Sequence, residues 1–421
     1  MQTSTDDIGT GTNARHGARP TPASLAPATP APLTIALFDD MTPLEAEWRA
    51  LQRDDLASLH QGYDWCAAWV ETYRPTLAIL RGGSGPHPAF ILPLEIVRSQ
   101  GVRIARFIGA PRSNINTGLF SPEFLARGDA VSAAERAAIV AALRGKADLL
   151  LLGNMPMAWR GRTSPLSSLP VIENQNRAFQ LPLLGSFEET MSQLSAKRRR
   201  KKHRHQTRLL NELGGYEHVV AATPDDIGRM LDLFLQQKAD RFKAAGLPDV
   251  FQGAETRAFL LRLLQTQDPS GDRPLELHGL RLKGVHDGHL PAIAALSRKG
   301  DHVICQFASI DESLVPEASP GELLFWMMIE KAQASGVNLF DFGIGDQLYK
   351  RSWCPVQTVQ HDAVLPISRL GRLAALGQKT VTRAKIFIKG NPKLYGLIQR
   401  LRAKRGAQQT LVTPASAPDG D

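Results

Sequence analysis

One short stretch, FDFGIGDQLYKRSW at residues 340–353, gathers side chains that can take part in proton transfer. Asp341 lies between two phenylalanines at the end of an apolar run, and Asp346, Tyr349 and Lys350 follow a Gly-Ile-Gly sequence. Carboxylates, a phenol and an amine are groups that enzymes use for general acid–base catalysis and for stabilising charge. The sequence therefore singles out these four residues as candidate catalytic residues, where a predicted strand passes into a predicted helix.

Each of these residues also has a structural interpretation. Asp346 can be the N-cap of the helix that follows it. Tyr349 is four residues before Trp353, so both can be core aromatics, and Lys350 can be a solvated helix charge. Asp341 faces the opposite side of its strand from its phenylalanine neighbours, so it is either exposed or buried with a partner.

The elements that must position these residues follow a regular order. Between a long basic helix and residue 366, periodicity and turn residues predict strand, two helices, three strands, helix, strand, helix and strand. From Leu33 the first half is predicted as strand, two helices, three strands, helix and strand. We therefore expect an α/β (α+β) fold of two tandem related units, residues 33–182 and 183–366, with mixed sheets flanked by helices.

The two ends of the chain have a different composition. Residues 1–32 are rich in Ala, Pro, Thr and Gly and are predicted to be a disordered tail. Residues 367–421 are predicted to be a basic amphipathic helix, broken near Asn391-Pro392, and a disordered end. Such a helix suits an anionic membrane surface or the groove of a partner protein, and it can equally pack on the body of the protein.

The positive charge is confined to two places. Lys197–Arg208 holds 8 Lys and Arg, and Arg369–Arg405 holds 11, with no acid in either stretch. Removing these basic residues from the net charge of +9 leaves −10, so the remainder of the chain is acidic. The first stretch is either a solvated helix or a site for a polyanion such as tRNA, the phosphates of coenzyme A or of a nucleotide-sugar, or an acidic glycan. Its candidate binding residues are Lys197, Arg198, Arg199 and Arg200, and no specific DNA binding is expected because no DNA-reading module is apparent.

The cysteines and histidines argue against a disulfide framework and a metal site. Cys66, Cys305 and Cys354 are odd in number and far apart, which is typical of reduced thiols. No Cys, His or Asp cluster has metal-ligand spacing, and no apolar run is long enough to cross a membrane. We expect a cytoplasmic protein without a metal, peripheral at the inner membrane where its basic tail finds anionic lipid.

Three sequence features resemble a known family. They are the Pro-Gly before the helix in SPGELLFWMMIEKAQASG, the segment DFG-x-GD-x-x-YK-x-x-W, and the basic motif S-x-K-R-R-R…L…L-G-G. That motif lies in a long helix predicted from a capping box at Ser186 and Glu189 to Gly214-Gly215. Together they resemble the double-GNAT (N-acetyltransferase) acyltransferases that include CelD-type cellulose-biosynthesis proteins, which are similar to FemAB-type aminoacyltransferases. The first half, with LEAEWRAL, DWCAAWVE and FIGAP, is similar to the first unit of that family. The resemblance covers roughly residues 33–366.

The resemblance implies a site for a thioester donor, acyl-coenzyme A (acetyl-coenzyme A). In the GNAT fold the thioester inserts between two splayed parallel strands, which here are HVICQFASI and VNLFDF. Phe307 and Ala308 on the first strand, with Ser319 and Gly321 at the start of the next helix, would then bind the donor. Tyr349 would protonate the leaving sulfur, Asp341 and Asp346 would handle the acceptor amine, and Lys350 would neutralise negative charge.

One departure from the GNAT pattern leaves the identity of the acyl donor undecided between coenzyme A and tRNA. The loop DESLVPEASPGELL has a single glycine and carries Asp311, Glu312 and Glu317, where GNAT enzymes wrap the pyrophosphate with a Gly-rich loop. The resemblance thus implies an acyltransferase that acts on an amine or hydroxyl acceptor, with a role in cellulose or exopolysaccharide biosynthesis. The alternatives are FemAB-like transfer from aminoacyl-tRNA onto a cell-wall precursor, and a non-catalytic scaffold for a polysaccharide synthase.

Overall fold

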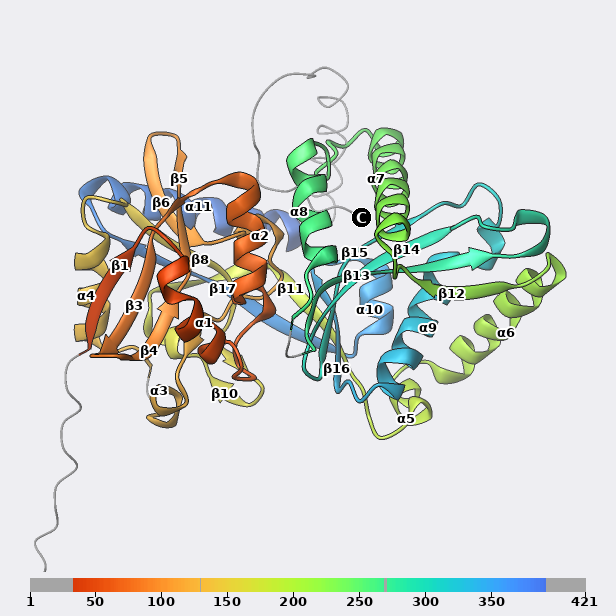
Figure 1. Cartoon of the computed structure of the whole chain (residues 1–421), viewed down its shortest axis with the longest axis horizontal. Coiled ribbons are helices and arrows are strands. Elements are labelled where there is room, and N and C mark those ends of the chain that lie inside the picture. Colours follow the sequence, from red (N-terminus) through yellow and green to blue (C-terminus); the bar gives the residue numbers. More distant parts are fainter. Residues whose placement is uncertain (1–32, 129, 269–270, 391–421) are drawn as a thin grey trace, which may run out of the picture. The chain divides into compact units, whose positions relative to one another are not determined.

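The computed structural model describes residues 33–128, 130–268 and 271–390 (Figure 1). Residues 1–32 and 391–421, which include the predicted disordered tails, lie outside the described residues. The described chain passes through two successive series of strands and helices, coloured red to yellow and green to blue.

The first series has the predicted succession of strand, two helices, strands, helix and strand, but it holds more elements than predicted, because the predicted strand AFILPLEIV divides at Pro93 and short strands and an extra helix are added. Its elements are β1 (Thr34–Phe38), α1 (Glu45–Leu51), α2 (Tyr63–Tyr73), β2 (Thr76–Leu77), β3 (Ile79–Ser84), β4 (His87–Leu92), β5 (Leu94–Ser99), β6 (Val102–Phe107), β7 (Leu119–Phe120), α3 (Pro122–Ala126), α4 (Ala133–Leu143), β8 (Leu149–Pro156), β9 (Ala158–Trp159), β10 (Arg162–Thr163) and β11 (Val171–Pro182). Helix α4 begins with the predicted capping box, in which Ser132 and Glu135 each accept a backbone N–H of the other.

The second series has the predicted order of strand, two helices, three strands, helix, strand, helix and strand, with further helices at both ends. Its elements are α5 (Phe187–Ser192), α6 (Ala196–Glu212), β12 (Tyr216–Val220), α7 (Pro224–Ala245), α8 (Ala254–Gln265), β13 (Arg273–Leu282), β14 (Ala292–Lys299), β15 (His302–Ile310), α9 (Pro320–Ala334), β16 (Leu339–Ile344), α10 (Leu348–Trp353), β17 (Val356–Pro366) and α11 (Arg369–Gly390). The predicted long basic helix from Ser186 is wrong in one detail. Ser186 caps only the short α5, and the basic run forms the separate α6 because the backbone at Ser195 is not helical.

Strand exchange joins the two series into one large sheet. Its strand order is β12-β13-β14-β15-β16-β11-β17-β8-β6-β5-β2, while β1, β3, β4 and β7 form a smaller sheet. Each series contains one parallel pair, β6 with β8 and β15 with β16. After β8, the next strand of the large sheet is β11, which pairs with β16. The strand after β16 is β17, which pairs with β8, and β11 and β17 pair with each other. The prediction of two tandem, related units with mixed sheets is confirmed, and each unit lends the other a strand.

Alternating side chains of the central strands enter different cores. Ile293 and Ala295 of β14 pack with α2, α7 and α8, whereas Ala292, Ala294 and Leu296 pack with α9. Helices α7 and α8 lie on one face of the second series and α9 on the other (Figure 1). The first of these cores also contains tryptophans of the N-terminal unit, so the two units share buried surface.

Helix α11 packs on the sheet through small residues. A Cβ on Gly371 would lie only 1.7 Å from the carbonyl oxygen of Asp148, and Ala375 and Thr382 are buried. Ser368 caps the helix by accepting the N–H of Gly371 and donates to Asp148. The start of the predicted basic tail is therefore a packed helix. Among the helices of the described ranges, none combines the length and the apolar character that a bilayer crossing requires.

Candidate active site

The parallel strands β15 and β16 separate after three residue pairs. They are paired at His302 with Leu339, Val303 with Phe340, and Ile304 with Asp341, and no further. Beyond this point β15 continues beside β14, with a bulge between Cys305 and Phe307. Strand β16 turns away through Gly343, whose φ of 72° is accessible to glycine at little cost. Beyond the bulge, alternate backbone amides of β15 consequently face a gap and not a neighbouring strand.

A cavity of about 820 Å³ opens at this gap, and it receives most of the residues predicted to act on or bind the donor. Tyr349 and Lys350 of the predicted catalytic group line it. All four predicted donor-binding residues line it as well: Phe307, Ala308, Ser319 and Gly321. Asp341 and Asp346 are not among the lining residues.

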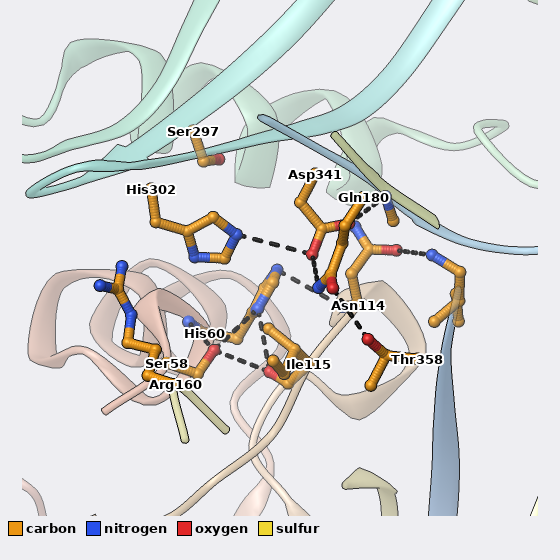
Figure 2. Close-up of polar contacts among 12 residues, drawn as sticks. Ser58, His60, Asn114, Ile115, Arg160, Gln180, Ser297, His302, Asp341 and Thr358 are labelled. Carbon is orange, nitrogen blue, oxygen red and sulfur yellow. Dashed lines mark hydrogen bonds and ion pairs between the residues drawn. The ribbon is translucent and has the colours of Figure 1, made fainter. Parts of the chain in front are cut away.

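Asp341 is buried behind the cavity and is fully engaged within the protein. Its exposed fraction is 2%, and it accepts hydrogen bonds from Gln180 Nε2 at 2.8 Å and from the N–H of Gly343 at 2.6 Å. Gln180 in turn accepts from Thr358, and His302 Nε2 lies 3.5 Å from the carboxylate (Figure 2). These side chains belong to β16, β11, β17 and β15. Of its two possible environments, Asp341 has the buried and paired one, and it ties four strands together where β16 leaves the sheet.

Asp346 lies on the surface beside Arg351, with which it forms a two-pronged ion pair. The N-cap of α10 is Gln347, one residue further along the chain, so the alternative role of Asp346 as N-cap is not borne out. Trp353, the other aromatic of this helix, is a core residue with an exposed fraction of 1%.

Tyr349 and Lys350 are held in the cavity wall by packing. The ring of Tyr349 stacks on Phe325 of α9 at 5.4 Å between centroids, and burial raises the pKa of its phenol well above the usual range. Lys350 Nζ donates to the carbonyl oxygen of Ile344 at 2.6 Å, and burial lowers the pKa of its ammonium to about 8. Lys350 is thus not the solvated helix charge of the alternative interpretation.

A second buried lysine lines the cavity and was not singled out by the sequence. Lys238 of α7 is 9% exposed, and its Nζ lies 5.5 Å from the ring centroids of Phe242 and Phe251. Within the described ranges it has no hydrogen bond or ion pair, and burial lowers its pKa to about 8. Arg112 and Arg241 also line this side of the cavity. The sequence does not mark Lys238 as a cavity residue, because a single lysine in a helix with many polar residues is ordinarily exposed. Its burial depends on the loop that carries Phe251, which is not adjacent in the sequence.

Asn114 of the N-terminal unit lies between β15 and β16 where the two strands separate. Its Nδ2 donates to Gln306 Oε1 of β15 at 2.8 Å, and its Oδ1 accepts the N–H of Ile344 of β16 at 3.3 Å (Figure 2). A Cβ on Gly343 would lie 2.7 Å from that Oδ1, so the glycine makes room for it. Gln306 also contacts His60, whose pKa burial lowers to about 4. Sequence reasoning missed these residues because Asn114 and Gln306 are 192 positions apart.

The start of α9 forms the remaining wall. A Cβ on Gly321 would lie 2.8 Å from Ile310 Cγ2, so glycine lets the helix start lie against the end of β15. Two of the acids near this wall have basic neighbours: Glu322 pairs with Lys202 of α6 at 2.6 Å, and Asp311 lies 3.3 Å from His289. Glu312 lines the cavity. Of these acids, Glu322 thus has a permanent counter-charge, whereas Glu312 brings a carboxylate to the cavity.

The four predicted polyanion-binding residues divide into two kinds. Arg199 points inward, with its guanidinium 3.6 Å from the ring centroid of Trp353 and a hydrogen bond to the carbonyl of Ser352. Lys197, Arg198 and Arg200 are exposed, and Arg200 pairs with Glu188. Arg199 therefore fastens α6 to α10.

The described residues hold no cluster of three His, Cys, Asp or Glu side chains that could bind a metal ion. Cys66, Cys305 and Cys354 are buried free thiols.

Comparison with known proteins agrees with this geometry. Residues 197–351 match the model of an acetyltransferase (GNAT) domain. The crystal structure of FemX has a TM-score of 0.57 at 12% identity, over 79% of this chain and 98% of FemX. A conserved protein of unknown function from Bacteroides thetaiotaomicron has a TM-score of 0.50 at 12% identity, over 79% of this chain and all of that one, 100%. No curated protein matches the sequence. Residues 197–351 are thus similar to a GNAT acetyltransferase domain, and the fold of the chain is similar to that of FemX.

Proposed function

We propose that the chain transfers an acyl group from a coenzyme A thioester to an amine or hydroxyl acceptor in the cavity between β15 and β16. The observation that carries the proposal is the end of strand pairing at Ile304 and Asp341, directly beside Tyr349 and Lys350. A thioester placed there can accept hydrogen bonds from the backbone amides of β15 that face the gap. Gly321 and the N-terminus of α9 offer backbone N–H groups to the donor's phosphates.

The chemical step needs a proton acceptor and a proton donor. The acceptor nitrogen or oxygen attacks the carbonyl carbon and loses its proton to a base, the carbon–sulfur bond breaks, and the departing thiolate accepts a hydrogen bond from Tyr349, whose raised pKa keeps the phenol protonated. Lys350 stabilises the negative charge that develops on the carbonyl oxygen. Lys238, with a pKa of about 8 and no partner among the described residues, is the group best suited to receive the acceptor's proton in its neutral form.

The acceptor class rests on the sequence resemblance to CelD-type proteins, which supports an acceptor on the route to cellulose or another exopolysaccharide. Aminoacyl-tRNA remains the second candidate donor, because the fold is similar to that of FemX and because α6 exposes Lys197 and Arg198. In that case the thioester would be replaced by an aminoacyl ester at the same gap. Burying the charged side chains of Lys238 and Lys350 lowers the stability of the fold. A scaffold without activity gives no functional reason for this cost, so the two lysines argue against that alternative.

Thermal stability distinguishes the donors. A ligand that binds only the native state stabilises it and so raises the melting temperature. At a ligand concentration of a hundred times Kd, the stabilisation is about 2.7 kcal/mol. We expect acetyl-coenzyme A to raise the melting temperature of the full chain and aminoacyl-tRNA to leave it unchanged. Stabilisation by aminoacyl-tRNA alone would establish the second donor, and no shift with either at millimolar thioester would favour the scaffold.

A further inference from the structure

Helix α11 turns its large apolar side chains away from the protein. Leu373, Leu376 and Phe387 have exposed fractions of 68%, 63% and 68%, whereas the small residues Gly371 and Ala375 face the sheet. Six of the eleven exposed large hydrophobic side chains in the described part of the chain lie on this one helix. An amphipathic helix that only completes a core has the reverse arrangement, with its large residues inward.

The charge on the same helix has one sign. Residues 369–388 include Arg369, Arg372, Lys379, Arg383 and Lys385 and no Asp or Glu. A row of cations runs along one flank of the apolar face and consists of Arg372, Lys379 and Arg383. Their spacings of seven and four residues place them above one another on the same side of a helix. Within the described residues, none of them takes part in a salt bridge shorter than 4.0 Å, so this row lacks a counter-charge inside the protein.

We propose that the outer face of α11 lies on an anionic lipid surface, with Leu373, Leu376 and Phe387 inserted and the cationic row at the level of the headgroups. This arrangement is that of an interfacial helix, which lies in the plane of the membrane and does not span it. The proposal concerns the protein's location and is independent of the acyl-transfer chemistry.

Charge argues against two other occupants of this face. Residues 391–421 carry five Lys and Arg and two Asp, so this segment would bring more positive charge to a surface that already lacks a counter-charge. A second copy of the chain would place one cationic row against another. An anionic bilayer supplies both the counter-charge and an apolar layer.

Sedimentation with vesicles tests this proposal on the full chain. The protein should pellet with vesicles of phosphatidylcholine and phosphatidylglycerol in equal parts at low salt. It should stay in solution with phosphatidylcholine alone, and binding should weaken as salt rises. Changing Leu373, Leu376 and Phe387 together to Ser should lower the vesicle partition constant at least roughly tenfold, because the buried apolar area is lost. Changing Arg372, Lys379 and Arg383 together to Gln should abolish the preference for phosphatidylglycerol.

The matched control is Val285→Ser, which removes an exposed apolar side chain (76%) from a loop elsewhere and should leave vesicle binding unchanged. Thermal melting of each variant checks that the fold is retained. The proposal is overturned if wild type and the triple Ser variant pellet equally, or if neither binds phosphatidylglycerol vesicles. It is also overturned if wild type is a dimer that the triple Ser variant disrupts, because the face would then be an interface between copies.

Discussion

Tyr349→Phe is expected to lower turnover by ~10²–10⁴-fold while leaving the fold and donor binding intact, because only the proton donor to the leaving sulfur is removed. The ring stays stacked on Phe325 in the variant, since that contact does not involve the hydroxyl. The wild-type phenol stays protonated through the neutral range because burial raises its pKa, so its O–H can donate a hydrogen bond to the leaving sulfur. The measurement is release of free thiol from acetyl-coenzyme A in the presence of a panel of amine and hydroxyl acceptors.

The control for this variant is Tyr216→Phe. Tyr216 lies on β12, where its hydroxyl contacts Thr207 at 2.9 Å, and it does not line the cavity. Its loss should leave thiol release unchanged. Equal turnover in wild type and Tyr349→Phe would remove Tyr349 from the mechanism.

Asp341→Ala is expected to have the largest effect on stability. The substitution leaves Gln180 Nε2 and the N–H of Gly343 without their acceptor in a buried place, and each unsatisfied donor costs about 1–3 kcal/mol. We expect a loss of roughly 2–5 kcal/mol in the free energy of unfolding, measured by denaturant titration. Asp341→Asn keeps one acceptor oxygen and should lose less.

Asp346→Ala is the matched control, because it removes a carboxylate from the same segment. Its ion pair with Arg351 is exposed, and such pairs contribute about 0–1 kcal/mol. If the two alanine variants were equally stable and Asp341→Ala alone lost turnover at unchanged stability, Asp341 would be catalytic and not a residue that positions β16.

The sequence predicts local order better than it predicts contacts between distant segments. Element order, the capping box at Ser132 and the helix after Pro320 follow from periodicity and cap residues, which are local signals. Tyr349 and Lys350 are close in sequence to the strand end, so a local motif sufficed to place them in the cavity. The roles of Asp341 and Arg199 could not be predicted, because burial with Gln180 and Trp353 depends on strands and helices far along the chain.

The exchange of β11 and β17 between the units shows the same difficulty at the level of topology. Their sequences predict strands, but the choice of neighbour depends on which edge each unit leaves open. Asn114 and Lys238 contribute to the cavity only because the N-terminal unit and the loop with Phe251 close over β15. The membrane contact of the basic tail stays a prediction, now assigned to the outer face of α11.

Hydrogen exchange of the β15 backbone in the presence of acetyl-coenzyme A tests the central claim most directly. If the thioester enters the gap, it accepts hydrogen bonds from those amides of residues 305–310 that point away from β14, and their exchange should slow on adding the donor. Residues 319–325 at the start of α9 should be protected as well, and the parallel strand β6 of the N-terminal unit should not change. Stabilisation by acetyl-coenzyme A with no protection of residues 305–310 would contradict the account, because the donor would then bind elsewhere.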